Sequence, residues 1–93
     1  MKGIIRFVKR LFGKYETGYE YWIYTKRIKV NPEWRKTRIG KAKFSRKIRY
    51  WYKIGKFESK IILDREFNLI DGYSSVRIAE IYGIDKVPVY FVD

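Results

Sequence analysis

Apolar residues recur at helical spacing in two segments of the 93-residue chain, and basic residues occupy the opposite side of each segment. In residues 1–14 the apolar side chains share one side of a helical wheel, and Gly13 provides a stop. This pattern predicts a short basic amphipathic helix. Such a helix either docks on the sheet of the domain or lies on an anionic membrane. Docking is favoured because so short a chain has little core to spare.

The second helical segment covers residues 42–54 and ends before Gly55. The side chains expected on its inner face follow the i, i+4, i+7, i+8 spacing and are Phe44, Ile48, Trp51 and Tyr52. Those expected on its outer face are Ser45, Arg46, Lys47, Arg49 and Lys53. We therefore expect a strongly basic helix whose aromatic side packs on the core.

Between these two segments, residues 19–30 are rich in aromatic and β-branched side chains and predict a strand. Asn31 and Pro32 end it, because both residues favour turns. Residues 33–41 are basic and follow no clear period. We expect a loop there.

From Lys60 onward the pattern changes to the alternating or continuous apolar runs of short strands. The expected elements are strands over 60–64, 69–70 and 86–92, a turn over 65–68, and a helix that follows 71–75, runs to Tyr82 and is capped by Gly83. Pro88 lacks an N–H group, which favours either an edge position for the last strand or a place where the chain enters the sheet. The prediction is a single domain over residues 1–93, of α+β or α/β class. It has a small mixed sheet of about four short strands with two or three helices.

The positive charge is concentrated in the middle of the chain. The formal net charge of the protein is +12, and residues 26–60 alone carry +12 while residues 61–93 carry −3. A segregated positive field attracts polyanions. Nucleic acid is therefore the favoured partner, ahead of an acidic protein or nucleoprotein and of an anionic membrane.

The residues that the chain lacks exclude several kinds of chemistry. It contains no Cys and no His, which removes disulfides, Cys/His zinc sites and every catalytic pair built on a thiol or an imidazole. No apolar run has the length of a membrane span, and basic residues interrupt the N-terminal segment where a secretory signal would be continuous. A cytoplasmic protein is expected.

A nucleic-acid interface is expected in the basic middle segment. The residues predicted to contact phosphates are Arg35, Lys36, Arg38, Lys41, Lys43, Arg46, Lys47 and Arg49. Trp34 and Tyr50 are predicted to be exposed and to stack on bases.

The last third of the chain, residues 60–93, resembles the ParB/sulfiredoxin-like domain (the ParB N-terminal-like domain). The resemblance rests on the run from Ile62 to Tyr73, which contains Asp71-Gly72, and on the later sequence Val87-Pro88-Val89. Relatives of this fold place a nucleotide or DNA phosphate at the turn before the helix. The resemblance therefore implies that the phosphate-facing residues here are Gly72, Tyr73, Ser74 and Ser75, with Arg77 reaching back. A helix cap is the simpler and favoured role for Ser74 or Ser75.

Three departures from the family pattern weigh against an enzyme. The basic cluster that relatives carry directly after this glycine is missing, and so is a recognisable CTP signature. The catalytic Cys of sulfiredoxin is absent, which excludes that activity. Asp64, Glu66 and Asp71 are the candidates for a Mg²⁺ site that cleaves phosphodiesters. The favoured reading is that Asp64 and Glu66 are ordinary turn residues and that Asp71 caps a helix.

Three functions remain, in order of preference. The first is a non-catalytic nucleic-acid-binding protein, with DNA favoured over RNA. The second is a small regulator or inhibitor, for example from a phage or another mobile element, that binds a protein or nucleoprotein. The third is a ParB-like nucleotide-binding protein or metal-dependent nuclease. Only the third requires a nucleotide or Mg²⁺.

Overall fold

The computed structural model describes residues 15–92, so the helix predicted over residues 1–14 lies outside the described part. The elements follow in the order β1 (Tyr21–Tyr24), η1 (Thr25–Arg27), α2 (Pro32–Lys36), α3 (Lys41–Ile54), β2 (Ile61–Leu63), β3 (Leu69–Asp71), α4 (Tyr73–Ile81) and β4 (Lys86–Phe91). Within residues 15–92, no helix is long and apolar enough to cross a membrane.

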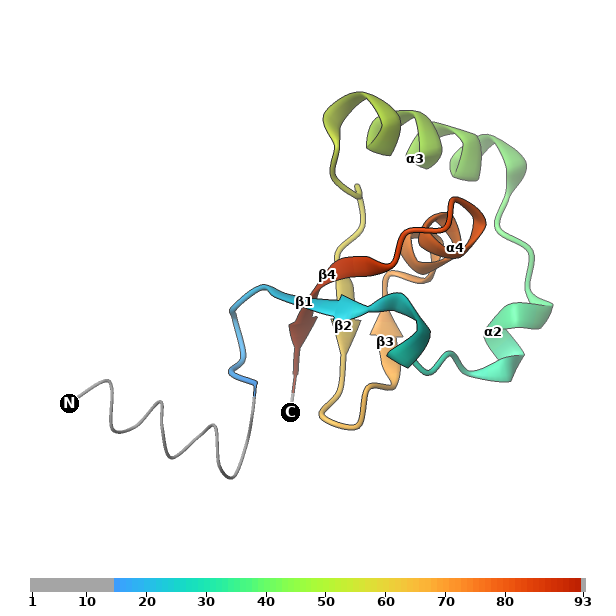
Figure 1. Cartoon of the computed structure of the whole chain (residues 1–93). Coiled ribbons are helices and arrows are strands. Elements are labelled where there is room, and N and C mark those ends of the chain that lie inside the picture. The colour runs from blue at the N-terminus through green and yellow to red at the C-terminus, as the bar shows by residue number, and fades with distance from the viewer. Residues whose placement is uncertain (1–14, 93) are drawn as a thin grey trace.

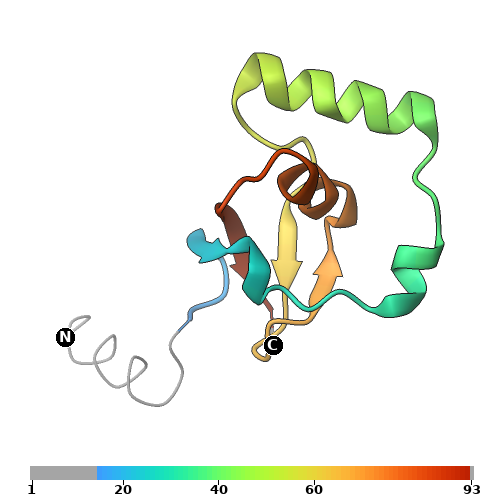
Figure 2. The same ribbon diagram turned by 45° about the vertical axis from the view of Figure 1, so that its right-hand side comes forward.

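The four strands form one mixed sheet in the order β1-β4-β2-β3. β4 is antiparallel to β1 and parallel to β2, and β2 is antiparallel to β3. Both ribbon views place α4 between α3 and the sheet (Figures 1 and 2). The predicted class, a small mixed sheet of four short strands with helices, is confirmed.

The core lies between the sheet and α4. Alternation along β4 directs Val87, Val89 and Phe91 to this side, and all three side chains are fully buried. Ile61 and Leu63 of β2 lie beside them, and the small and branched residues of α4 close the core from above. The strict period-two pattern of β4 thus explains why only one face of the sheet is packed.

The strand predicted over residues 19–30 is shorter in the structure, since it ends at Tyr24. The chain then turns through η1, where the N–H of Ile28 donates to the carbonyl of Thr25 at 3.1 Å. Lys29 next pairs with the backbone beside β3, at the other edge of the sheet. The apolar run therefore encodes an edge strand followed by a crossing segment.

The loop predicted over residues 33–41 is wrong for its first part, which forms helix α2. Pro32 occupies the first turn, where its missing N–H has no intrahelical partner to lose. The side chain of Asn31 caps the helix by accepting from the Glu33 N–H at 2.9 Å. A cap followed by proline was the available sequence signal.

The edge position predicted from Pro88 is also wrong, because β4 lies inside the sheet between β1 and β2. Val92 donates its N–H to Leu63 at 2.9 Å, so the even-numbered residues of β4 direct their backbone groups toward β2. Pairing between β4 and β2 starts only at Val89. The missing N–H of Pro88 thus falls just before the shared ladder and costs no sheet hydrogen bond.

Helix α3 confirms the prediction for residues 42–54, and Gly55 ends it with a left-handed φ of 81°. The predicted faces need two corrections. Tyr52 is 82% exposed, whereas Lys47, predicted on the outer face, is 8% exposed. Lys47 lies between Phe44 and Trp51 on the packed side, because it is three residues after the first and four before the second.

Candidate phosphate-binding pocket and basic helix

The turn between β3 and α4 depends on Gly72. Its φ is 92°, in the left-handed region, and a Cβ placed there would collide with the carbonyl oxygen of Lys60 and lie 2.8 Å from Ile61 Cα. Positive φ and close backbone approach therefore both require glycine at this position. The close approach brings the start of α4 against the entry of β2.

Two backbone N–H groups at the start of α4 point out of this turn without a partner in residues 15–92. Asp71 accepts from the Gly72 N–H at 2.8 Å, while the N–H groups of Ser75 and Val76 bond to Gly72 O at 3.1 and 3.2 Å. Those of Tyr73 and Ser74 remain for a ligand. The positive end of the helix dipole favours an anion at this point.

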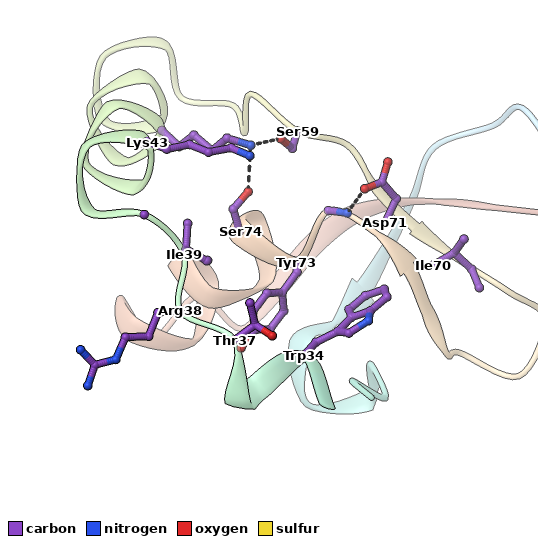
Figure 3. A pocket seen from close by; sticks show the side chains of 13 residues that line it. Trp34, Thr37, Arg38, Ile39, Lys43, Ser59, Ile70, Asp71, Tyr73 and Ser74 are labelled. Atoms are coloured by element: carbon purple, nitrogen blue, oxygen red, sulfur yellow. Dashed lines mark hydrogen bonds between the residues drawn. The ribbon is translucent and has the colours of Figure 1, made fainter. Parts of the chain in front are cut away.

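The favoured cap role for Ser74 or Ser75 is wrong, since no side chain caps α4. Ser75 is 1% exposed and donates its hydroxyl to the carbonyl of Ser59 at 2.6 Å. Ser74 instead directs its hydroxyl to α3 (Figure 3). Ser75 is thus structural, and of the two serines only Ser74 presents its side chain to the open space before the helix.

Lys47 supplies a positive charge at this place. Its ammonium donates to Ser59 Oγ at 2.5 Å and to Ser74 Oγ at 3.1 Å. An ammonium has three donors, so one is left. No carboxylate pairs with Lys47 within the described part of the chain. A poorly hydrated cation held only by neutral hydroxyls attracts an anion.

These groups line a pocket of about 480 Å³ between α3, α4 and the α2–α3 loop. Its lining includes Trp34, Thr37, Arg38, Ile39, Gly40, Lys43, Lys47, Ser59, Ile70, Asp71, Gly72, Tyr73 and Ser74. Arg38 and Lys43 are exposed cations at its margin. The basic segment and the glycine turn therefore meet in one site, although they are separate in sequence. Arg77, expected to reach back to Gly72, is absent from this lining and bonds Glu80 at 2.9 Å.

The outer face of α3 carries the basic side chains that remain exposed. At about 100° per residue, Lys43, Arg46, Tyr50, Lys53 and Arg49 share one arc opposite the packed side. Tyr50 is 41% exposed, so its ring is accessible in the middle of this arc. We call these five residues the α3 basic face.

Several predicted contact residues are engaged elsewhere. Arg35 of α2 forms two hydrogen bonds with Glu80 of α4, at 3.2 and 2.8 Å. Lys36 pairs with Glu33 at 3.3 Å, and Arg46 with Glu58 at 3.1 Å.

Trp34 is half-buried against Tyr73, with ring centroids 6.2 Å apart, so the prediction of an exposed stacking residue is wrong. Lys41, by contrast, is exposed at the start of α3.

The residues considered for a metal site are not brought together. Asp64 accepts from the N–H groups of Glu66 and Asn68, both at 2.9 Å, and from the Asn68 amide at 3.0 Å. These hydrogen bonds, chiefly that from the Asn68 side chain, hold the pKa of the Asp64 carboxyl below its usual value. Asp71 lies at the opposite end of β3. No group of three acidic side chains within residues 15–92 is placed to hold a metal ion.

The arrangement of elements is that of ParB N-domains. The structure of a Pnob8-like ParB-N domain matches with a TM-score of 0.67, at 20% identity over 81% of this chain and 30% of that chain. ParB from Caulobacter crescentus in complex with CTP-γ-S matches with a TM-score of 0.63, at 15% identity over 82% of this chain and 45% of that chain. The resemblance seen in residues 60–93 thus extends to the fold of most of the chain.

A third match is a free serine kinase mutant in complex with AMP, with a TM-score of 0.64 and 13% identity over 85% of this chain and 33% of that chain. No protein-family model and no curated protein matches the chain. The chain spans less than half the length of the ParB and kinase structures it matches. At these identities the likeness shows a shared fold.

Sequence reasoning missed Ser59 as a member of the pocket, whereas it predicted Lys47 as a phosphate contact. Ser59 precedes β2 with no motif to mark it. Lys47 was assigned to the wrong face, although its spacing from Phe44 and Trp51 gave a usable signal. The cations that the sequence lacks directly after Gly72 are supplied from α3 and from the loop before it.

Proposed function

We propose that this chain is a non-catalytic nucleic-acid-binding protein, with DNA as its favoured ligand. One phosphate group occupies the pocket before α4, and the α3 basic face holds the neighbouring phosphates. The observation that carries this proposal is that Lys47, Lys43 and Arg38 line the same pocket as the free N–H groups of Tyr73 and Ser74.

The chemistry of the pocket suits a phosphate oxygen better than a carboxylate side chain. Backbone N–H groups, an ammonium and a serine hydroxyl converge there, and a phosphate offers several oxygen acceptors at once. The Asp71 carboxylate also lines the pocket and accepts from the Gly72 N–H at 2.8 Å, so the three cations Lys47, Lys43 and Arg38 outnumber one carboxylate around the ligand.

The α3 basic face extends this site into a surface for a polymer. Its four cations and Tyr50 lie along the outer side of a 14-residue helix. Contacts of this type neutralise backbone phosphates without reading base edges. We therefore expect strong affinity with little sequence preference from this surface.

Salt dependence tests the proposal. The protein is titrated into a fluorescein-labelled DNA duplex, and Kd is followed by anisotropy from about 0.05 to about 0.3 M salt. We expect log Kd to rise linearly with log salt concentration. Each Lys or Arg that contacts a phosphate displaces counterions from the DNA, and added salt opposes this release. The double variant Lys43→Gln/Arg49→Gln is expected to reduce the slope by about 2, one for each lost contact.

Lys36→Gln is the matched control, because it removes an exposed cation that lies on α2 and pairs with Glu33. It is expected to leave the slope within about 0.5 of the wild-type value, well short of one contact. An affinity that stays flat as salt is raised, or equal slopes for both variants, would exclude the proposed surface.

A second candidate is a nucleotide-binding protein, favoured by the pocket of about 480 Å³. The similar ParB and kinase structures contain CTP-γ-S and AMP, respectively. Isothermal titration calorimetry with CTP and ATP separates the two candidates. If the wild type releases heat of binding with a nucleotide and Lys47→Met does not, the nucleotide is favoured as the ligand. If the wild type shows no heat of binding, nucleic acid remains the ligand.

A further inference from the structure

The sheet has a second face, turned away from α4, that carries exposed aromatic residues. Trp22 and Tyr24 of β1 are 62% and 47% exposed. Their neighbours in β4 on this face are Pro88 and Lys86, in direct register. Tyr90 follows two residues after Pro88 and so lies on the same face. An aromatic surface of this kind on a small protein marks a binding site.

Lysine side chains lie over these rings. The Lys86 ammonium is 4.7 Å from the centre of the Tyr24 ring, and the Lys60 ammonium is 5.1 Å from that of Tyr90. Tyr90 also donates its hydroxyl to Glu20 at 3.3 Å, and desolvation followed by the Glu20 charge raises the pKa of this phenol. The rings are therefore held in place while their surroundings stay positively charged.

A cavity of about 590 Å³ deepens one side of this face. Trp22, Pro88 and Tyr90 line it from the sheet, and Trp51 of α3 and Phe57 of the segment after α3 line it as well. Its volume is in the range of about 300–1,000 Å³ that is usual for small-molecule sites. Ser59 lines both this cavity and the pocket before α4, so the two hollows adjoin along the loop that enters β2.

We propose that this aromatic sheet face binds single-stranded DNA. One base stacks in the cavity against Trp22 and Tyr90, and Lys60, Lys86 and Lys56 contact the flanking phosphates. Stacking on flat rings accepts any base, and the lysines match the charge of the backbone. The strand continues past Ser59 toward the α4 pocket, which gives it a path between the two sites.

Charge decides against the other occupants of this face. Residues 1–14 contain five basic side chains and one apolar stripe, so they would meet the lysines with like charge. A second copy of the chain would present the same lysines to their own image. An anionic chain with planar, stackable groups satisfies both the rings and the cations.

This inference rests on the proposed function in its ligand class, nucleic acid, but it uses a different surface. The test compares fluorescein-labelled oligothymidine of about 12 nucleotides with a duplex of equal length. Trp22→Ala is expected to weaken oligothymidine binding about tenfold while changing duplex binding less than about twofold. Trp22→Phe keeps a stacking ring and is expected to stay within about threefold of wild type.

Tyr52→Ala removes an exposed aromatic residue from α3 (82% exposed, against 62% for Trp22) and is the matched control. Trp22 is mostly exposed, and a thermal melt checks that its variants fold as the wild type does. If Trp22→Ala binds oligothymidine as wild type does while Lys43→Gln/Arg49→Gln loses duplex affinity, this inference fails and the proposed function stands. If Trp22→Ala loses oligothymidine affinity while Lys43→Gln/Arg49→Gln binds duplex DNA as the wild type does, the α3 surface is excluded and the inference for the sheet face stands.

Two further outcomes overturn the inference. If the protein binds oligouridine about tenfold more tightly than oligothymidine, the ligand of this face is RNA. If light scattering shows a dimer of the wild type and a monomer of Trp22→Ala, the sheet face is the contact with a second copy of the chain.

Discussion

At the scale of single residues, the candidate pocket depends on Gly72 and Lys47. Gly72 has a φ of 92°, and the backbone at the start of β2 lies directly against its Cα hydrogen. Lys47 combines an exposure of 8% with a charge that no described carboxylate neutralises. The first residue sets the position of the α4 N-terminus, and the second supplies the charge that faces it.

Gly72→Ala is expected to lower the free energy of unfolding by about 2–5 kcal/mol, because positive φ and backbone overlap add up. Gly55→Ala is the matched control: its φ is 81°, but a Cβ there meets only open space. It is expected to cost about 1–2 kcal/mol. Urea unfolding of both variants measures the difference. Equal losses would mean that the crowding at Gly72 relaxes freely.

Lys47→Met separates binding from stability. Methionine fills a similar volume without a charge, so we expect the free energy of unfolding to change by no more than about 1 kcal/mol. DNA affinity at low salt is expected to fall at least about tenfold, since a charge-assisted contact to phosphate is lost. Urea unfolding and anisotropy measure the two quantities. A large loss of stability with unchanged affinity would make Lys47 a purely structural residue.

At the scale of elements, Glu80 connects α2 to α4. Its carboxylate bonds Arg35 of α2 and Arg77 of α4, at 2.8 and 2.9 Å. The hydrogen bond from Arg35 is the main cause that lowers the pKa of Glu80 below its ordinary 4.5, and the same bond raises the pKa of Arg35. α2 carries Trp34, so this connection also fixes one wall of the pocket.

Stability is therefore expected to depend on pH through Glu80. A carboxyl whose pKa is lowered on folding stabilises the protein above its ordinary pKa and loses that effect as the pH falls through the lowered value. Thermal unfolding between about pH 6 and pH 3 should show a loss that Glu80→Gln reduces. The effect should be no more than about 1 kcal/mol per ion pair, because these side chains are partly exposed. Asp64 contributes in the same sense below its ordinary 3.8.

The elements of the last third were predictable because each has a local signal. Alternation gave β2 and β4, and the glycine after Asp71 gave the start of α4. Helix α2 was missed because five residues are too few for a period, and only the cap at Asn31 marks it. The pocket was beyond local signals, since Lys47 and Ser59 meet Ser74 only through the packing of α3 on α4.

At the scale of the whole molecule, positive charge and exposed rings lie on two surfaces, and the pocket before α4 adjoins the cavity of the sheet face at Ser59. Helix α3, which carries the α3 basic face, is the outermost layer, with α4 between it and the sheet (Figure 2). The aromatic sheet face is on the side of the sheet away from α4. The net charge of +12 acts over both. A field of this strength accelerates encounters with a polyanion before any contact forms.

Association kinetics should show this field. Raising salt from about 0.05 to about 0.3 M is expected to lower the association rate constant for duplex DNA about tenfold or more, with a smaller change in the dissociation rate constant. Stopped-flow anisotropy measures both rate constants. A salt effect confined to dissociation would place the electrostatic contribution in short-range contacts alone.

The position of β4 has a consequence for synthesis of the protein. β4 comes last in the described chain, yet it separates β1 from β2 and contributes Val87, Val89 and Phe91 to the core. During synthesis on the ribosome, β1 and the β2–β3 hairpin cannot join into one sheet until β4 has emerged as far as Phe91. A nascent chain cut short before Lys86 exposes two strand edges and an open core. Such truncated products are expected to be aggregation-prone substrates for chaperones and proteases.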